Sequence, residues 1–259
     1  MTRRPGFPAS NALPPAPASS KDRTLPGGSR PQQPAAPIAP VQGLGLDSGA
    51  VRARMVSRLA AQGIADPRVL AALGSVERHR FVDSALVNQA YEDTSLPIGL
   101  AQTISKPSVV GRMVELLLAG SPSGKLGRVL EIGTGCGYQA AVLAQVANEV
   151  YSIERLRGLH EKARANLRHF RLPNVHLLFG DGMQGFAKGA PYAGIIAAAG
   201  GDAVPQAWLD QLAIGGRIVA PTVMPDGKQA LVVLEKTARE VRQSVLETVH
   251  FVPLKSGIA

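Results

Sequence analysis

Three glycines at alternating positions, Gly133, Gly135 and Gly137, follow an apolar run and a single acid, Glu131. Glycine lets the backbone approach a ligand closely and adopt dihedral angles that other residues avoid. The residues after Gly137 favour a helix, whose N-terminal amide groups would point at the same ligand. The stretch therefore predicts a binding loop for a nucleotide or a related cofactor.

Three cofactor classes compete for this loop. A phosphate-binding P-loop requires Gly-Lys-Ser or Gly-Lys-Thr, which the sequence lacks here. A dinucleotide fingerprint is formally present, because Gly135, Gly137 and Ala140 fit the pattern G-x-G-x-x-A, but that pattern alone is weak. S-adenosylmethionine carries a sulfonium and an ammonium in place of phosphates. Glu131 would repel a pyrophosphate and suit a cationic ligand, so the loop favours S-adenosylmethionine.

Two further acids end predicted strands in the same region. Glu154 ends the second predicted strand, 17 residues after Gly137. A carboxylate there can accept hydrogen bonds from both ribose hydroxyls. Asp181 ends the third, in place to accept from an adenine amino group. Each acid alone is equally explained as a solvated strand end or a helix cap. One acid at the end of each of three strands, together with the glycine loop, indicates a site for S-adenosylmethionine.

The elements that must position these residues alternate between strands and helices after Gly127. Predicted strands cover residues 128–132, 149–154, 175–179, 193–198, 216–221, 229–235 and 245–252, and predicted helices cover 138–147, 156–172 and 205–212. This alternation implies parallel β-α-β units with helices on both faces of a sheet, and the last two strands are expected to form an antiparallel edge hairpin. Ligands of such sheets bind beyond the carboxyl ends of the strands, at the switch point.

The N-terminal part of the chain has a different character. The first forty residues hold ten of the twenty prolines, so we expect a disordered tail over residues 1–46 and a single domain over 47–259. Helical spacing of apolar residues marks 48–84 and 107–119, and the stretch SLPIGLAQTISKP between them is predicted to be irregular. Residues 47–120 are expected to cover substrate and cofactor, and residues 121–259 to form the cofactor-binding core.

Composition limits the classes of partner. The net charge of +9 suggests an acidic partner, although the surplus is spread along the chain and solubility is the simpler interpretation. The single cysteine, Cys136, excludes an intrachain disulfide and a cysteine metal cluster, and no metal is predicted. No apolar stretch approaches the roughly 20 residues of a membrane span, and no apolar core follows Arg3 and Arg4 as in a secretory signal. The cytoplasm is the expected location.

The methyl acceptor can be narrowed by what the sequence lacks. Enzymes that methylate amino groups on bases often carry an Asn-Pro-Pro-Tyr type stretch after the fourth strand, where this chain reads AAAGGDAVPQ. There is also no His or Cys cluster for metal-assisted chemistry and no obvious general base. A carboxylate is ionised above a pKa of about 4 and needs no base. We therefore expect an acceptor that is already nucleophilic.

The stretches LPIGLAQTISKP, VLEIGTGCGYQAAVLA, YSIER, GDG and VPQAWLDQLAIGGRIVAP together resemble the protein-L-isoaspartate O-methyltransferase family over residues 51–254. That family transfers a methyl group from S-adenosylmethionine to the α-carboxylate of L-isoaspartyl residues in damaged proteins, and the ester then closes to a succinimide. The resemblance implies an α/β fold: a doubly wound, mostly parallel sheet of the S-adenosylmethionine-dependent methyltransferase type, with N-terminal helices and an antiparallel edge hairpin. It implies isoaspartyl proteins and peptides as partners; a monomer without nucleic-acid or membrane partners is expected.

The resemblance also places the family's functional serine on Ser105. From the motifs and the resemblance together, the predicted cofactor-binding residues are Gln102, Thr103, Ile104, Ser105, Glu131, Gly133, Gly135, Gly137, Glu154, Asp181, Gly182 and Gln229. The chain departs from the family's usual residues at Ala193, at Ala198 and at Cys136.

Two roles compete for Ser105, which comes just before a predicted helix. As an N-cap its hydroxyl would stabilise that helix by about 1 kcal/mol. As a functional group it would donate to one oxygen of the substrate carboxylate, and the helix end would favour the anion. Two other functions are left open by the sequence: an RNA or small-molecule methyltransferase with the same cofactor site, and a nucleic-acid-binding module that retains a vestigial loop.

Overall fold

The computed structural model describes residues 49–119, 121 and 124–259, and these residues belong to one compact unit. The tail predicted over residues 1–46 lies outside the described residues. Among the described helices, none has the length and apolar character needed to cross a membrane.

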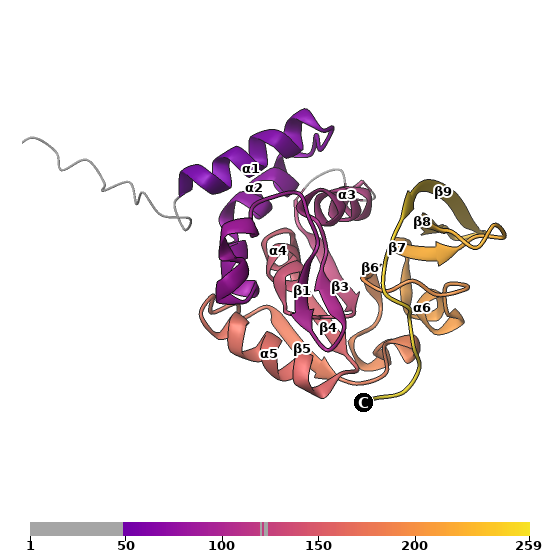
Figure 1. The fold of residues 1–259 in the computed structure, drawn as a ribbon. Helices are drawn as coiled ribbons and strands as arrows, with labels where there is room; N and C mark the ends of the chain where they lie inside the picture. The colour runs from indigo at the N-terminus through magenta and orange to yellow at the C-terminus, as the bar shows by residue number, and fades with distance from the viewer. Residues whose placement is uncertain (1–48, 120, 122–123) are drawn as a thin grey trace, which may run out of the picture. The chain divides into compact units, whose positions relative to one another are not determined.

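A seven-stranded sheet forms the centre of this unit (Figure 1). In sheet order its strands are β5 (Val175–Phe179), β4 (Ala147–Glu154), β3 (Leu126–Ile132), β6 (Tyr192–Ala197), β7 (Leu212–Val223), β8 (Gln229–Lys236) and β9 (Val241–Val249). Neighbouring strands are parallel from β5 through β7, and β8 and β9 pair antiparallel at one edge. The predicted doubly wound, mostly parallel sheet with an antiparallel edge hairpin is therefore confirmed.

Helices cover both faces of this sheet. They are α1 (Gly49–Ala61), α2 (Pro67–Ser75), α3 (Pro107–Leu118), α4 (Tyr138–Val146), α5 (Arg157–Arg168) and α6 (Gln206–Gln211). Ile196 of β6 packs in the same cluster as the side chains of α2, α3 and α4, whereas its neighbour Ile195 packs with Trp208 of α6. Because successive strand residues point to opposite faces, α6 lies on the other side of the sheet.

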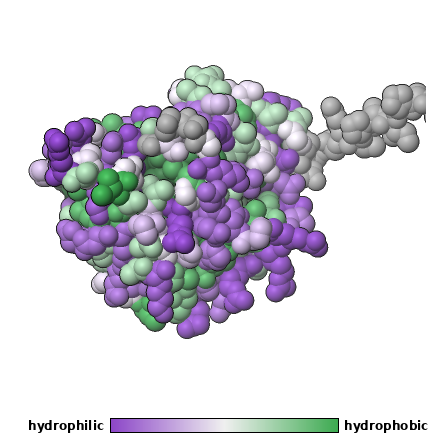
Figure 2. Space-filling model, turned by 180° about the vertical axis from the view of Figure 1, so that it is seen from behind, coloured by the Kyte–Doolittle hydropathy of each residue, from purple (hydrophilic) through white to green (hydrophobic). Residues whose placement is uncertain are grey.

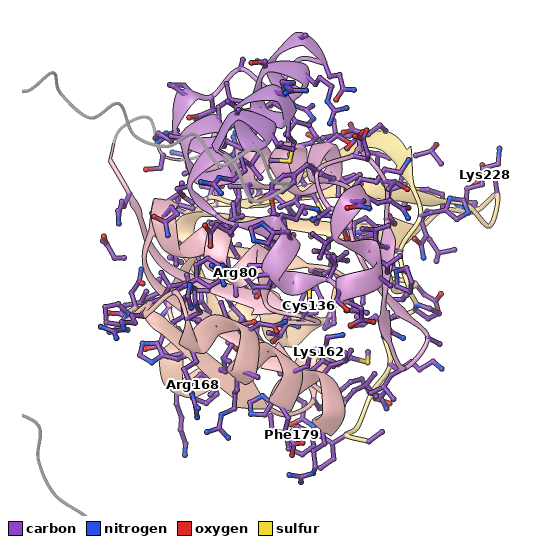
Figure 3. All side chains as sticks on the ribbon, turned by 60° about the vertical axis from the view of Figure 1, so that its left-hand side comes forward. Arg80, Cys136, Lys162, Arg168, Phe179 and Lys228 are labelled. Atoms are coloured by element: carbon purple, nitrogen blue, oxygen red, sulfur yellow. The ribbon has the colours of Figure 1, made fainter. Side chains whose placement is uncertain are left out.

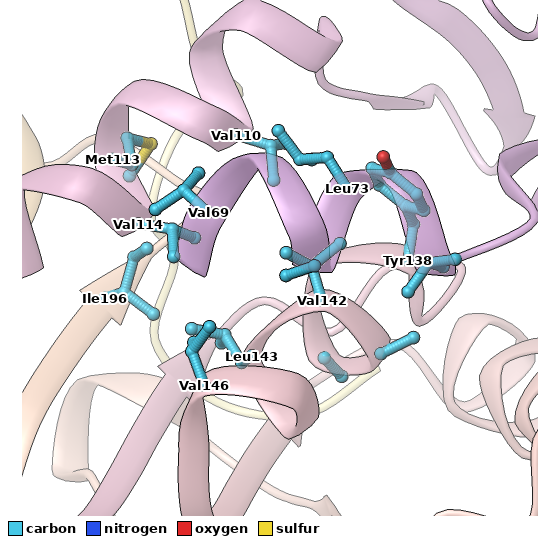
Figure 4. Close-up of a cluster of buried hydrophobic side chains, with 14 of the residues drawn as sticks. Val69, Leu73, Val110, Met113, Val114, Tyr138, Val142, Leu143, Val146 and Ile196 are labelled. Carbon is cyan, nitrogen blue, oxygen red and sulfur yellow. The ribbon is translucent and has the colours of Figure 1, made fainter. Parts of the chain in front are cut away.

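The apolar face of α3 explains why this helix is held firmly. Val110, Met113, Val114 and Leu117 recur at helical spacing and are at most 1% exposed. Figure 4 shows the first three of these meeting side chains of α2 and α4 and Ile196 of β6. Burial of each such side chain stabilises the fold by about 1.5–3 kcal/mol. The segment that enters α3, which contains Ser105, is therefore attached to a rigid element.

The outer surface is mainly polar, in keeping with the charge of the chain. Hydrophilic residues cover much of the face seen from behind, with small hydrophobic patches between them (Figure 2). Single exposed apolar side chains of this kind are normal for a globular protein.

The stretch predicted to be irregular before α3 is instead a small antiparallel sheet. It consists of β1 (Leu96–Gly99) and β2 (Gln102–Ile104), joined through Leu100 and Ala101. These two turn residues have φ angles of 52° and 55°, which residues other than glycine rarely adopt. Hairpin turns of this handedness usually carry Gly, Asn or Asp, so Leu-Ala provides no recognisable turn signal and the prediction was wrong.

Two other boundaries also differ from the prediction. The last strand begins at Val241 instead of residue 245 and ends at Val249, because a solvent-exposed edge strand carries polar residues that hide its pattern. The helix predicted to reach residue 172 ends at Arg168, and Arg171 has a φ of 48°, which a helix cannot contain. The residues after β9 leave the sheet and approach the predicted site.

Candidate active site

A cavity of about 310 Å³ lies beyond the carboxyl ends of β3, β4 and β6. Its walls include Gly133 after β3, Glu154 at the end of β4 and Ala198 after β6. The chain adds β4 and β5 on one side of β3 and then returns to add β6 on the other. The cavity therefore opens at the switch point of the sheet, where ligands of doubly wound folds bind.

The three glycines of the loop have different tasks. All three have positive φ angles, 89° at Gly133, 57° at Gly135 and 94° at Gly137. Gly133 and Gly135 line the cavity, whereas a Cβ on Gly137 would lie 2.9 Å from Leu167 Cδ1. Gly137 thus lets α4 pack closely against α5, and the first two glycines keep the cavity open.

Glu154 lies on the cavity wall with both carboxylate oxygens already held. Its Oε2 accepts a hydrogen bond from the Gly135 amide and its Oε1 from the Leu156 amide, each at 2.9 Å. The side chain is only 5% exposed. Each carboxylate oxygen has a second lone pair, so Glu154 can hold the glycine loop and still accept from a ligand hydroxyl.

Glu131 has a different environment although it lies on the neighbouring strand. Its side chain is completely buried, and the Ser152 hydroxyl donates to its Oε2. Burial raises the pKa of Glu131 to about 8, so the carboxyl group is largely protonated at neutral pH. Glu131 lies beneath the loop and does not line the cavity. The contact with a cationic ligand that the sequence suggested has no support from this position.

Of the predicted residues Asp181, Gly182 and Gln229, only Gly182 lines the cavity. The carboxylate oxygens of Asp181 instead accept hydrogen bonds from the backbone amides of Met183 at 2.9 Å and Gly257 at 2.8 Å. Gln229 donates to the Phe251 carbonyl at 3.2 Å and accepts from the Phe251 amide at 2.7 Å. Asp181 and Gln229 therefore fix the C-terminal segment, and neither lies on the wall of the cavity.

A second cavity of about 280 Å³ adjoins the first and contains Ser105 in its wall. The two cavities share Thr103, Ala198 and Val252 as lining residues. The segment from residue 102 to residue 105 crosses between them, with Gln102 on the first cavity, Thr103 on both and Ser105 on the second. Ile104 and Ser105 also line a small space of about 40 Å³ under the glycine loop.

Ser105 is not the N-cap of α3. The capping position is Lys106, which makes no side-chain capping bond, and the helix begins at Pro107. Asp93 instead accepts from the Ser108 amide at 2.9 Å and from the Ser108 hydroxyl at 2.8 Å. The structural role considered for Ser105 is thus taken by Asp93, which also places a negative charge at the helix end that was expected to favour an anionic substrate.

Several wall residues of the first cavity were missed by sequence reasoning. They are the hairpin residues Ile98, Leu100 and Ala101, the α5 entry residues Arg155, Leu156 and Leu159, and the C-terminal residues Val252, Pro253, Leu254 and Lys255. Ile98, Leu100, Ala101 and Arg155 lie inside the quoted stretches LPIGLAQTISKP and YSIER, but apolar residues and a single arginine carry no signal of their own for a cavity wall. Within the described ranges, no group of three His, Cys, Asp or Glu side chains is placed to hold a metal ion.

Comparison with known proteins agrees with this geometry. The family model described as protein-L-isoaspartate(D-aspartate) O-methyltransferase matches residues 50–259. The chain belongs to the protein-L-isoaspartate O-methyltransferase family. A protein of that name from Methylibium petroleiphilum is 62% identical over 217 residues, covering 83% of this chain and 81% of the relative. One from Burkholderia mallei is 54% identical over 252 residues, covering 96% and 77%.

Solved structures of the same family share the fold. One protein-L-isoaspartate O-methyltransferase has a TM-score of 0.72 at 28% identity and covers 80% of this chain and 67% of its own. Another, from Plasmodium falciparum and described as a complex with S-adenosyl-L-homocysteine, has a TM-score of 0.68 at 22% identity, covering 79% and 98%. This second likeness concerns the fold alone.

The three departures from the family's usual residues have distinct surroundings. Ala193 is partly buried in β6, beside Gly127. Ala198 lines all three cavities, where its small side chain occupies little space. Cys136 is 3% exposed, and burial raises the pKa of its thiol to about 11. The Cys136 thiol is therefore neutral and acts as a small apolar group in the loop.

Proposed function

We propose that this chain uses S-adenosylmethionine to methylate the α-carboxylate of L-isoaspartyl residues in proteins and peptides, as its family name implies. The observation that carries the proposal is the pair of adjoining cavities. One has the glycine loop and Glu154 in its wall, the other has Ser105, and Thr103 and Ala198 belong to both. Such an arrangement brings a methyl donor and an acceptor together at one point.

The residues of the first cavity fit the proposed cofactor. Gly133 and Gly135 supply bare backbone where a side chain would intrude, since a Cβ on Gly135 would lie 3.3 Å from Ile98 Cδ1. Glu154 offers oxygens for ribose hydroxyls, and Gly182 leaves room beside Ile132. Asp181 would contact an adenine amino group only through its remaining lone pairs, because Met183 and Gly257 already donate to it. When bound, S-adenosylmethionine supplies a methyl group on a positively charged sulfur, so transfer to a carboxylate requires no proton transfer.

Ser105 is proposed to hold the substrate carboxylate through its hydroxyl. Methyl transfer from a sulfonium to a carboxylate removes both charges, so a strong cationic contact would stabilise the reactant more than the transition state. A neutral hydroxyl donor orients the carboxylate without that penalty. His250 and Phe251 line the same cavity and are in place to contact the peptide on either side of the isoaspartyl residue.

The proposal is tested with two peptides that differ only in isoaspartate or aspartate at one position. We expect labelled methyl transfer to the first and on the order of 100-fold less to the second, because about 1 Å of misplacement costs that much. The nucleophile ionises near pH 4, so the rate should change little between pH 6 and pH 8. Equal labelling of both peptides, or labelling of RNA only, would contradict the proposal.

Ser105→Ala and Ser108→Ala form a matched pair for this experiment, since Ser105 lies two residues before α3 and Ser108 lies in its first turn. We expect Ser105→Ala to lower the methylation rate without a large loss of stability. Ser108→Ala should lower the melting temperature, because it removes a hydrogen bond to Asp93, and leave the rate nearly unchanged. The expected cytoplasmic location, monomeric state and lack of nucleic-acid binding stay predictions.

A further inference from the structure

Arg78 is a buried cation directly behind the proposed site. It belongs to a short 3₁₀ turn, Arg78–Phe81, and its side chain has no exposed surface. In the part of the chain that the structure describes, Arg78 takes part in no ion pair. An unpaired buried charge is costly to a fold, and that cost is consistent with a specific task.

The guanidinium group connects the Ser105 segment with two other segments of the chain. Its Nε donates to the Ala90 carbonyl at 2.8 Å, and its Nη2 donates to the Ser105 carbonyl at 2.7 Å. Its Cζ lies 4.6 Å from the ring centroid of Tyr138, the first residue of α4 after the glycine loop. One planar cation therefore sets the distance between the Ser105 segment and the helix that follows the cofactor loop.

The remaining polar atoms of this cluster are not fully satisfied. Arg78 Nη1 and the Tyr138 hydroxyl both lack a hydrogen bond of normal geometry, although both atoms are buried. Burial lowers the pKa of Arg78 from its ordinary value. The unsatisfied atoms are a cost to the fold, and that cost is consistent with a role in positioning.

We propose that Arg78 is a positioning residue for methyl transfer, which holds the backbone of Ser105 against Tyr138 so that the Ser105 hydroxyl meets the substrate carboxylate. This inference rests on the proposed role of Ser105. The hydrogen bond of Arg78 goes to the Ser105 carbonyl, so the guanidinium acts on the backbone and the Ser105 hydroxyl is left to meet the carboxylate; Lys106 is the cation in the wall of the second cavity. Arginine suits this place because its fixed fork reaches two carbonyls at once.

The first test is steady-state kinetics of Arg78→Lys with an isoaspartyl peptide. A lysine cannot reproduce the fork, so we expect kcat/KM to fall on the order of 10-fold or more. The affinity for S-adenosyl-L-homocysteine should stay within about threefold, because Arg78 lines no part of the cofactor cavity. Arg80→Lys is the matched control, since Arg80, labelled in Figure 3, lies in the same turn and is exposed. It forms an ion pair with Glu77. The control variant should change neither quantity.

A double-mutant cycle separates this inference from the proposed function. If Arg78 acts through Ser105, Arg78→Lys should cost little when added to Ser105→Ala, so the two losses are not additive. Additive losses, or a parallel loss of S-adenosyl-L-homocysteine affinity, would overturn the inference and leave the role of Ser105 standing. If Ser105→Ala alone had no kinetic effect, the proposed role of Ser105 would be the one that fails.

A second variant and a measurement on the unaltered protein cover the case in which Arg78→Lys does not fold. Arg78→Met removes the unpaired charge at similar volume but leaves the Ala90 and Ser105 carbonyls without their donor, so we expect a lower melting temperature together with the same pattern of kinetics. In the parent protein, nitrogen-labelled arginine should show a shift of the buried Arg78 Nε–H signal on saturation with the isoaspartyl peptide. The aspartyl peptide should not cause it. A signal that responds to neither peptide would overturn the inference.

Discussion

The floor of the cofactor cavity and the segments that cover it are held in different ways. The floor consists of Gly133, Gly135 and Glu154, which directly follow or end strands of the large sheet. The cover consists of the β1–β2 hairpin and residues 252–255, and the preceding residues His250 and Phe251 line the second cavity. Backbone ladders on both sides of β3 and β4 hold the floor, so the strands cannot move without breaking many hydrogen bonds.

Side chains hold the cover together with backbone hydrogen bonds, because Gly200 pairs with Val252 and Leu254 through backbone groups. Lys162 Nζ donates to the Ile98 carbonyl at 2.9 Å, which attaches the hairpin to α5. Gln229 holds Phe251 through two hydrogen bonds, and the Asp181 carboxylate holds Gly257. A two-stranded hairpin and a chain end open at a lower free energy than strands that are paired on both sides. We therefore expect the cover to open more readily than the floor.

Changing the floor should have the largest effect on cofactor binding. Glu154→Ala removes the acceptor for the Gly135 and Leu156 amides as well as the proposed ribose contact. Hydrogen bonds to a charged group are each worth about 1.5–3 kcal/mol, so calorimetry should show roughly 100-fold weaker S-adenosyl-L-homocysteine binding. Glu149→Ala, on the exposed part of the same strand, is the control. Unchanged affinity in Glu154→Ala would remove Glu154 from the site.

Loosening the cover should have a smaller effect that falls mainly on the peptide. Gln229→Ala frees Phe251, so the wall of the second cavity loses its support while the floor keeps its shape. Two neutral hydrogen bonds contribute about 0.5–1.5 kcal/mol each, which predicts roughly a 10-fold rise in KM for an isoaspartyl peptide. Gln243→Ala, exposed on β9, should leave KM unchanged. A loss of cofactor affinity as large as in Glu154→Ala would show that floor and cover are not distinct.

Glu131 should have the smallest effect on activity, because it lies under the floor and not on its surface. Its pKa is raised by burial, so its contribution to stability is present at low pH and is lost as pH rises toward about 8. Thermal unfolding of the parent without cofactor should therefore show a melting temperature that falls between pH 5 and pH 8, by roughly a few degrees. Glu131→Gln should remove most of that dependence and bind S-adenosyl-L-homocysteine normally. Strongly weakened binding in Glu131→Gln would instead support the direct cofactor contact suggested by the sequence.

Local signals were sufficient where the wall of the first cavity coincides with the end of a regular element. Glycines at alternating positions after an apolar strand predict a bare loop because glycine adopts the positive φ angles found at Gly133 and Gly135 without steric cost. Strand and helix periodicity placed Glu154 at a strand end, and parallel strands bring such ends to one edge. The motif around Ser105 placed that residue in the site through family resemblance, which no spacing argument would have supplied.

Tertiary structure decided which of two residues of the same type takes part in the proposed site. Glu131 and Glu154 both come at the ends of neighbouring strands, yet one is buried and neutral and the other lies on the cavity. Arg78 and Arg80 are two residues apart, and only the first is buried behind Ser105. The local sequence shows the type and the periodicity of these side chains, but not how deeply each is buried or what it contacts.

The sequence by itself determined the order of the strands and helices, the glycine loop and the family, because these depend on residues close together in the chain. The contacts that complete the site join residues far apart in the chain. Gln229 and Phe251 are 22 positions apart, Arg78 and Ser105 are 27 apart, and Arg78 and Ala90 are 12 apart. Such contacts depend on the packing of whole elements, and a hairpin turned by Leu100 and Ala101 gave no local sign of its presence. Burial and partner choice are properties of the folded chain, so only the tertiary structure could decide them.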